Sequence, residues 1–185
     1  MDLKPLHHSW RRAQYRVEQF GASLRLNVTS QELDRAAAWL PPDGPALFRR
    51  MARRDQRHSL TVCNRLRLAG HDEPDLLAAA LLHDVAKTVQ PNRRLLLAHR
   101  VLIVLMEAVK PGWVAQIARQ DPTDWRYPFY VHLHHPEQGA RLAEEAGCSQ
   151  LTVALIRRHQ IKLSAPPVDE EEQLLAWLQA ADDAS

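Results

Sequence analysis

Apolar residues recur along the chain at spacings of three and four, which is typical of amphipathic helices, and no stretch alternates as a strand does. Prolines and glycines separate these runs, and Ser, Thr or Asp stands in a capping position before several of them. The predicted helices lie at 8–26, 30–40, from 45, 53–70, 74–87, 92–109, 128–135, 136–147, 149–160 and from 169 onward. The pattern therefore predicts an all-α protein with short connections.

Two proline positions shape the predicted organisation. The segment PPDGP at 41–45 marks a boundary between an N-terminal helical segment, residues 1–50, and the body, residues 51–185. Pro136 is expected to break the helix that begins near residue 128, because an internal proline removes one backbone hydrogen bond.

The run LLAAALLHDVAK is expected to continue as one helix to Lys87.

Composition adds constraints on partners and location. The 185 residues carry a formal net charge of +2, which gives no sign of a polyanion-binding chain. Residues 1–57 hold 11 Lys and Arg against 6 Asp and Glu, so this segment could steer a phosphate-bearing ligand, form a homodimer contact or be a solvated helix face. Nucleic acid is not an expected partner, because these arginines lack interleaved aromatic residues. The two cysteines lack zinc-finger spacing, and no signal-like or membrane-spanning segment occurs, so we expect a cytoplasmic protein.

Histidine is unusually frequent, with ten in the chain. Side chains that converge from several rigid helices are what a metal site in a helical core requires. Successive helix residues point about 100° apart, so His83 and Asp84 cannot both be ordinary core residues, although both could flank one ion near the helix end. Six residues with metal-ligand chemistry fall on the predicted helices of the body: His58, His83, Asp84, His135, His159 and Asp182.

The chemistry of these side chains limits which metal ions the site would bind. Imidazole and carboxylate ligands suit first-row divalent ions such as iron, manganese, nickel, cobalt and zinc. A site that leaves positions open can bind water, lower its pKa and make it a nucleophile near neutral pH. The residues therefore favour metal-assisted chemistry with one ion or two.

Five segments carry a resemblance to a known family: RHS, LLHDVAK, HHPEQGA, RRHQ and AADDAS. In this order and at these spacings, residues 53–185 resemble the HD-domain superfamily of metal-dependent phosphohydrolases. HHPEQGA is similar to the third motif of the HDIG and HD-GYP-like branch, but the GYP triplet is absent after His159, so cyclic-di-GMP hydrolysis is not expected. The resemblance implies an HD-domain helical bundle with an additional N-terminal helical segment.

The resemblance also implies metal ligands. The primary ion would be bound by His58, His83, Asp84 and Asp182, and Asp84 would be a catalytic residue that orients the attacking water and bridges to a second ion. Asp182 and Asp183 are both candidates for the last carboxylate, and Asp182 is preferred because it continues the apolar stripe of the last helix and should face inward.

Substrate contacts are implied for a further set of residues. Lys87, one turn beyond Asp84, would act in catalysis by neutralising phosphate charge. His135 and His159 would bind the second ion, or contact the substrate phosphate if one ion is present. Independently of the resemblance, Arg126, in the loop before the third motif, could reach a phosphate or be a solvated loop residue.

Some assignments stay open at this point. His132 shares a face with His135 and is an alternative ligand, and His99 is a candidate for a substrate role. Gln160 stands where the fuller sites of the family carry a second histidine, so one of their ligands is missing.

The expected function is a metal-dependent phosphohydrolase that cleaves a small phosphate ester of the nucleotide type with metal-activated water. Two alternatives use the same residues. One is a non-catalytic regulatory HD module that binds a metal or a nucleotide, and the other is a di-iron oxygenase-like HD protein.

Overall fold

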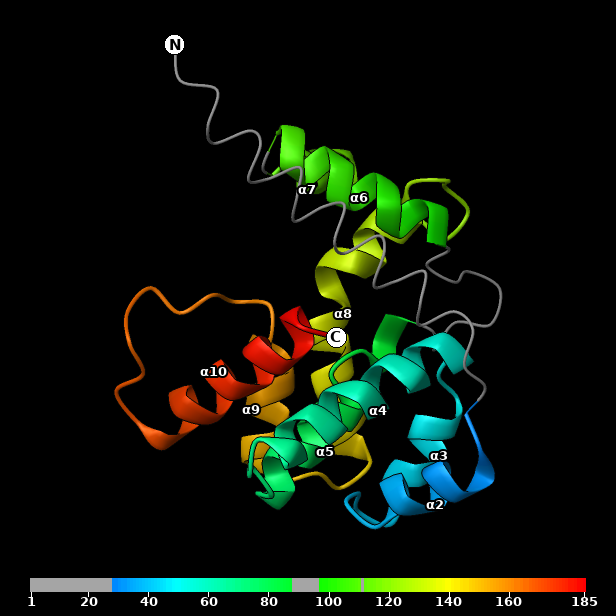
Figure 1. Cartoon of the computed structure of the whole chain (residues 1–185). Helices are drawn as coiled ribbons and strands as arrows, with labels where there is room; N and C mark the ends of the chain where they lie inside the picture. Colours follow the sequence, from blue (N-terminus) through cyan, green and yellow to red (C-terminus); the bar gives the residue numbers. More distant parts are fainter. Residues whose placement is uncertain (1–27, 88–96, 111) are drawn as a thin grey trace. The chain divides into compact units, whose positions relative to one another are not determined.

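The computed structural model describes residues 28–87, 97–110 and 112–185, and this part of the chain is helical without a strand (Figure 1). The all-α prediction is therefore confirmed, while the helix predicted at 8–26 lies outside the described residues. Among the described helices, none combines the length and apolar character needed to cross a membrane. The described elements are α2 (Ser30–Ala37), α3 (Gly44–Arg49), α4 (Arg53–Leu68), α5 (Pro74–Leu82), the 3₁₀ helix η1 (Val85–Lys87), α6 (Leu97–Val109), α7 (Trp113–Ile117), α8 (Tyr127–Glu145), α9 (Gln150–Arg158) and α10 (Glu170–Asp183).

The chain divides into two compact units. One comprises residues 1–25 and 90–133 and contains α6, α7 and the first part of α8. Its described core is small and contains Ile103, Val114 and Phe129. The other unit comprises residues 26–89 and 134–185 and contains the remaining helices.

The larger unit is built around α5, which is buried on every side. All residues from Leu76 to Leu82 are buried, so this helix shows no polar face. It packs against α4, α9 and α10, and α10 also contacts α4 and α9 (Figure 1). The end of α5 therefore lies in the interior of the unit, where any polar side chain that follows it must find partners.

The first two described helices pack with this body. Leu47 and Phe48 of α3 belong to the same buried core as α4 and α5. Thr29 caps α2 in a capping box with Glu32, and the guanidinium of Arg57 on α4 makes two bonds to the same glutamate, at 2.6 and 2.9 Å. The domain boundary at residue 50 stays a prediction.

Pro136 does not break its helix, so that expectation is wrong. A single helix, α8, runs from Tyr127 to Glu145 with Pro136 inside it. The proline removes only one backbone donor, and the helix after it is fixed by Ala140, Ala143 and Ala146, which are buried in the core. Packing therefore outweighs the local cost of the proline.

The helix predicted from 74 to 87 changes character before its end. The α-helix stops at Leu82, His83 is its C-cap, and the chain continues as η1 from Val85 to Lys87. Tighter 3₁₀ turns are common at helix ends, because they satisfy the last carbonyl groups. His83 and Asp84 therefore occupy the change of winding between two helical segments.

A buried amide joins α3 to α4. The side-chain nitrogen of Gln56 lies 3.1–3.2 Å from the carbonyl oxygens of Phe48, Arg49 and Met51, and Gln56 itself is buried. Phe48 and Arg49 are the last two residues of α3 and Met51 follows it, so no further turn of this helix bonds their carbonyls, although the Phe48 oxygen also accepts from the backbone N–H of Met51 at 3.1 Å. Gln56 therefore links α4 to the end of α3 through hydrogen bonds to these carbonyls.

We expect Gln56→Leu to lower the free energy of unfolding by about 1–3 kcal/mol, because it removes the side-chain donor that bonds the carbonyls at the end of α3. Urea denaturation followed by circular dichroism measures this loss. The same change at Gln150, which is exposed at the start of α9, is the matched control and should change stability by less than about 0.5 kcal/mol. Equal stability of Gln56→Leu and the parent protein would contradict the assignment.

Candidate metal centre

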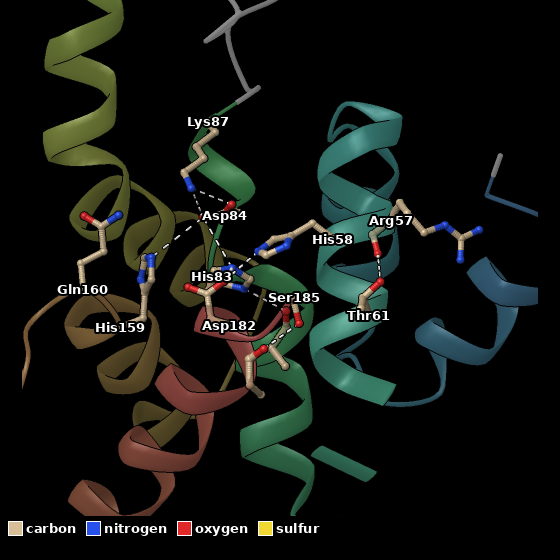
Figure 2. Close-up of polar contacts among 12 residues, drawn as sticks. Arg57, His58, Thr61, His83, Asp84, Lys87, His159, Gln160, Asp182 and Ser185 are labelled. Carbon is tan, nitrogen blue, oxygen red and sulfur yellow. Dashed lines mark hydrogen bonds and ion pairs between the residues drawn. The ribbon is translucent and has the colours of Figure 1, made fainter. Parts of the chain in front are cut away.

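The six ligands predicted from the sequence come together inside the larger unit. Figure 2 shows His58, His83, Asp84, His159 and Asp182 of this set. Four of the six are buried, namely His83, Asp84, His135 and His159, and each comes from a helix end or a helix that the core fixes. The helices contribute them as follows: α4 gives His58, the end of α5 gives His83 and Asp84, α8 gives His135, the end of α9 gives His159, and α10 gives Asp182.

One group of three potential ligands is formed by His58, His83 and Asp84, whose ligand atoms all lie within 4.8 Å of one another. Asp182 adjoins this group. Its Oδ1 lies 2.8 Å from His58 Nε2 and 3.6 Å from His83 Nε2. Asp183, by contrast, is exposed, so the geometry favours Asp182 as the carboxylate of α10.

A second group of three is formed by Asp84, His135 and His159, again within 4.8 Å. The Nε2 atoms of the two histidines are 3.3 Å apart. Asp84 Oδ1 lies 3.4 Å from His135 Nε2 and 3.9 Å from His159 Nε2. Asp84 therefore belongs to both groups, and its carboxylate lies between the two sets of imidazoles.

Two of the rings are held by backbone carbonyls behind them. His83 Nδ1 lies 3.0 Å from the carbonyl oxygen of Ala80, and His159 Nδ1 lies 2.7 Å from that of Ile156. A carbonyl oxygen only accepts, so the Nδ1 atoms carry the hydrogens, and in the neutral ring Nε2 presents its lone pair to the cluster. This is how proteins orient histidine ligands of a metal.

An unpartnered buried atom supports a cation at this place. His83 Nε2 is buried and makes no hydrogen bond within the described part of the chain, since both nearby carboxylate oxygens are 3.6 Å away. Leaving such a group unsatisfied costs about 1–3 kcal/mol. The side chains of His58 and Asp182 are 23% and 31% exposed, so the first group opens to solvent on their side. The donor set and its access therefore fit a divalent ion.

The electrostatics of the second group produce neutral imidazoles. Burial, together with the charge of Lys87, lowers the pKa of His135 to about 3. Burial, together with the charge of His83, lowers the pKa of His159 to about 4. Both rings are therefore neutral at pH 7, which is the form that binds a metal.

The pKa shifts of Asp84, Asp182 and His83 keep these three groups charged, in contrast to the neutral rings of His135 and His159. Burial opposes ionisation of Asp84, but the positive charges of Lys87 and His83 hold its pKa well below the usual range. For Asp182, burial is likewise outweighed by the charge of His83 and the hydrogen bond with His58, so its pKa is also low. Burial would lower the pKa of His83, yet Asp84 and Asp182 raise it to about 9. Without a metal, a proton on His83 is the counter-charge of the two carboxylates.

Lys87 is held directly against the shared carboxylate. Its Nζ lies 2.6 Å from Oδ1 and 2.7 Å from Oδ2 of Asp84 (Figure 2). The lysine side chain is 13% exposed, so the ammonium group is close to both the cluster and solvent.

Three other candidates are in the unit of residues 1–25 and 90–133, which is described separately. Arg126 binds the carboxylate of Asp124 in its own loop, with distances of 2.6–3.2 Å. His99 contacts the ring of Phe129, with centroids 6.4 Å apart. His132 is on the part of α8 assigned to this unit and is in neither group of potential ligands. The substrate role of Arg126 stays a prediction.

Sequence reasoning missed one side chain at the cluster. The amide nitrogen of Gln160 lies 3.3 Å from His135 Nε2, although the sequence suggested only that a ligand was missing there. Its position directly after His159 was the available signal, because a residue adjacent to a ligand at a helix end can reach the same site.

Comparison with known proteins gives a family. A family model described as "HD domain" matches residues 56–183, which is more than half of the chain. No curated protein and no solved structure matches the chain. The matched segment begins just before His58 and ends just after Asp182, so it contains all six residues of the cluster. This chain therefore belongs to the HD-domain family.

Proposed function

We propose that this protein is a metal-dependent phosphohydrolase that cleaves a small phosphate ester of the nucleotide type. The observation that carries the proposal is that the carboxylate of Asp84 belongs to both groups of three potential ligands. A carboxylate shared in this way can hold two ions at the short separation found in two-metal phosphatases and nucleases. Membership of the HD-domain family supports the same chemistry.

The chain offers two positions for a divalent ion such as iron, manganese, nickel, cobalt or zinc. When bound, such an ion polarises water and neutralises charge on the phosphoryl oxygens. The first position would use His58, His83, Asp84 and Asp182, and the second Asp84, His135 and His159.

The protein's own groups would orient the reactants. Asp84 is ionised and buried, so its carboxylate can accept a hydrogen bond from the attacking water and hold it in place. The ammonium group of Lys87 beside it provides a positive charge that can contact a phosphoryl oxygen. If one ion is present, His135 and His159 are near enough to the shared carboxylate to contact the phosphate instead. Arg126 is a further candidate for the phosphate.

Activity should depend on Asp84 and not on a nearby carboxylate outside the cluster. We expect the manganese-loaded protein to release phosphate from a member of a nucleotide panel, and Asp84→Asn to reduce kcat at least roughly a hundredfold. Asp183→Asn is the matched control, because Asp183 is exposed on the same helix as Asp182. It should retain activity within about twofold of the parent.

The same assay distinguishes hydrolysis from the two alternative functions, a regulatory module and an oxygenase. Metal binding without turnover of any phosphate ester would contradict the proposal and favour a regulatory module. Oxygen consumption by the iron-loaded protein, again without phosphate release, would favour oxygenase chemistry.

Replacing Lys87 should change kcat/KM for the substrate more than it changes the affinity for the metal. We expect Lys87→Met to lower kcat/KM about ten- to a hundredfold, the value of one charge-assisted hydrogen bond. Manganese affinity should stay equal or increase, because a positive charge beside Asp84 is removed. Lys87→Arg should recover part of kcat/KM, and Lys162→Met, in an exposed loop, is the control. A parallel loss of metal affinity in Lys87→Met would instead indicate a structural role.

Metal binding should release a proton from His83. Its pKa of about 9 means that it is largely protonated at pH 8, whereas His135 and His159 are neutral. Since a metal ligand must be deprotonated, apparent manganese affinity should rise about tenfold per unit between pH 7 and 8.5 and level off above the pKa.

Calorimetric titrations in buffers of different ionisation enthalpy count the released protons directly. We expect about one proton per first ion bound at pH 8. The absence of proton release, together with an affinity that does not change from pH 7 to 8.5, would show that His83 is not the ligand.

A further inference from the structure

Gln160 also reaches the cluster, beside the six predicted ligands and Lys87, and the proposed function gives it no role. Gln160 follows His159 at the end of α9 (Figure 2). Its amide nitrogen lies 3.3 Å from His135 Nε2. The residue is exposed, whereas the histidine it contacts is buried. Its amide therefore stands where the second group of ligands meets solvent.

The distances from His135 to the other members of the second group are those expected between neighbouring ligands of one ion, whereas Asp84 Oδ1 and His159 Nε2 are farther apart, at 3.9 Å. Bonds of about 2.1 Å to a tetrahedral or octahedral ion place adjacent ligand atoms about 3.0–3.4 Å apart. His135 Nε2 lies 3.3 Å from His159 Nε2, 3.4 Å from Asp84 Oδ1 and 3.3 Å from the Gln160 amide. The amide thus has the same relation to His135 as the other members of the group.

The amide can supply either of two groups to this position. Its nitrogen donates hydrogen bonds, while its oxygen is a ligand for hard divalent cations. Once an ion holds the lone pair of His135 Nε2, that atom no longer accepts a hydrogen bond from Gln160. Because the side chain is exposed, the amide has room to turn and present its oxygen instead.

We propose that the amide oxygen of Gln160 is a fourth protein ligand of the second ion position, beside Asp84, His135 and His159. This inference rests on the proposed function, since it requires that position to bind an ion. Two carboxylates, Asp84 and Asp182, serve the first position, whereas the second combines the shared Asp84 with neutral groups. The second ion is therefore the weaker and the more readily exchanged of the two.

The test uses manganese alone, so that it does not depend on a substrate. Metal-free full-length protein is titrated with Mn²⁺ by calorimetry for the parent, Gln160→Ala and Gln160→Glu, and bound manganese per chain is measured after dialysis. Gln150→Ala is the matched control, because it makes the same change at the exposed start of α9. Circular dichroism establishes that each variant is folded, and Gln160→Glu preserves the shape of the side chain if Gln160→Ala is unstable.

The parent should bind a first Mn²⁺ and then a weaker second one. Gln160→Ala should weaken only the second, on the order of tenfold, whereas Gln160→Glu should strengthen it, because a carboxylate replaces a neutral ligand. Gln150→Ala should match the parent at both positions.

Three results would overturn the inference in distinguishable ways. Two ions with unchanged affinities in both Gln160 variants would remove Gln160 from the site and leave the proposed function intact. A single ion in the parent would exclude the second position while leaving one-metal hydrolysis. No bound manganese or other first-row ion in the parent would overturn the proposed function as well.

Discussion

The structure of the larger unit depends on how it accommodates one buried carboxylate. Asp84 is ionised in the interior, and an unpaired charge there would cost several kcal/mol. The chain surrounds it with Lys87, His83, His135 and His159, which come from the end of α5, from η1 and from two other helices. Only Lys87 and His83 supply positive charge without a metal, and the other two rings are neutral. A divalent ion on either side of Asp84 would complete this compensation, which is why the cluster fits a metal centre better than a structural ion-pair network.

The rest of the unit gives these side chains fixed positions. Because α5 is buried on all sides, its end cannot move toward solvent to relieve the charge. The change from α-helix to 3₁₀ helix after Leu82 places His83 and Asp84 at a break in the winding, so the two need not follow the spacing of a regular helix. Gly139, one turn beyond His135, has an ideal Cβ position only 3.4 Å from Ile156 and 3.5 Å from Val85. A larger residue there would press on the contact of α8 with α9 and η1, and would shift His135 relative to Asp84.

Much of the fold could be predicted because it depends on local signals. Thr29, Ser149 and Asp169 cap their helices as their sequence context suggests, and Gly70 and Gly147 end helices in a left-handed conformation. The prediction of the fold failed where packing outweighed local preference, at Pro136 inside α8 and at the end of α5.

The six-residue cluster was predicted because its residues have ligand chemistry on separate helices and resemble a known motif. The contact of Gln160 was not predicted, because it depends on where the end of α9 lies relative to His135 inside α8.

The central claim is that the six clustered side chains hold metal ions on both sides of Asp84. Anomalous diffraction at the manganese absorption edge, from crystals of the manganese-loaded protein, tests it most directly because it locates ions independently of any activity. We expect one peak bounded by His58, His83, Asp84 and Asp182, and a second between Asp84, His135 and His159. Manganese peaks elsewhere in the molecule, with none beside Asp84, would contradict it.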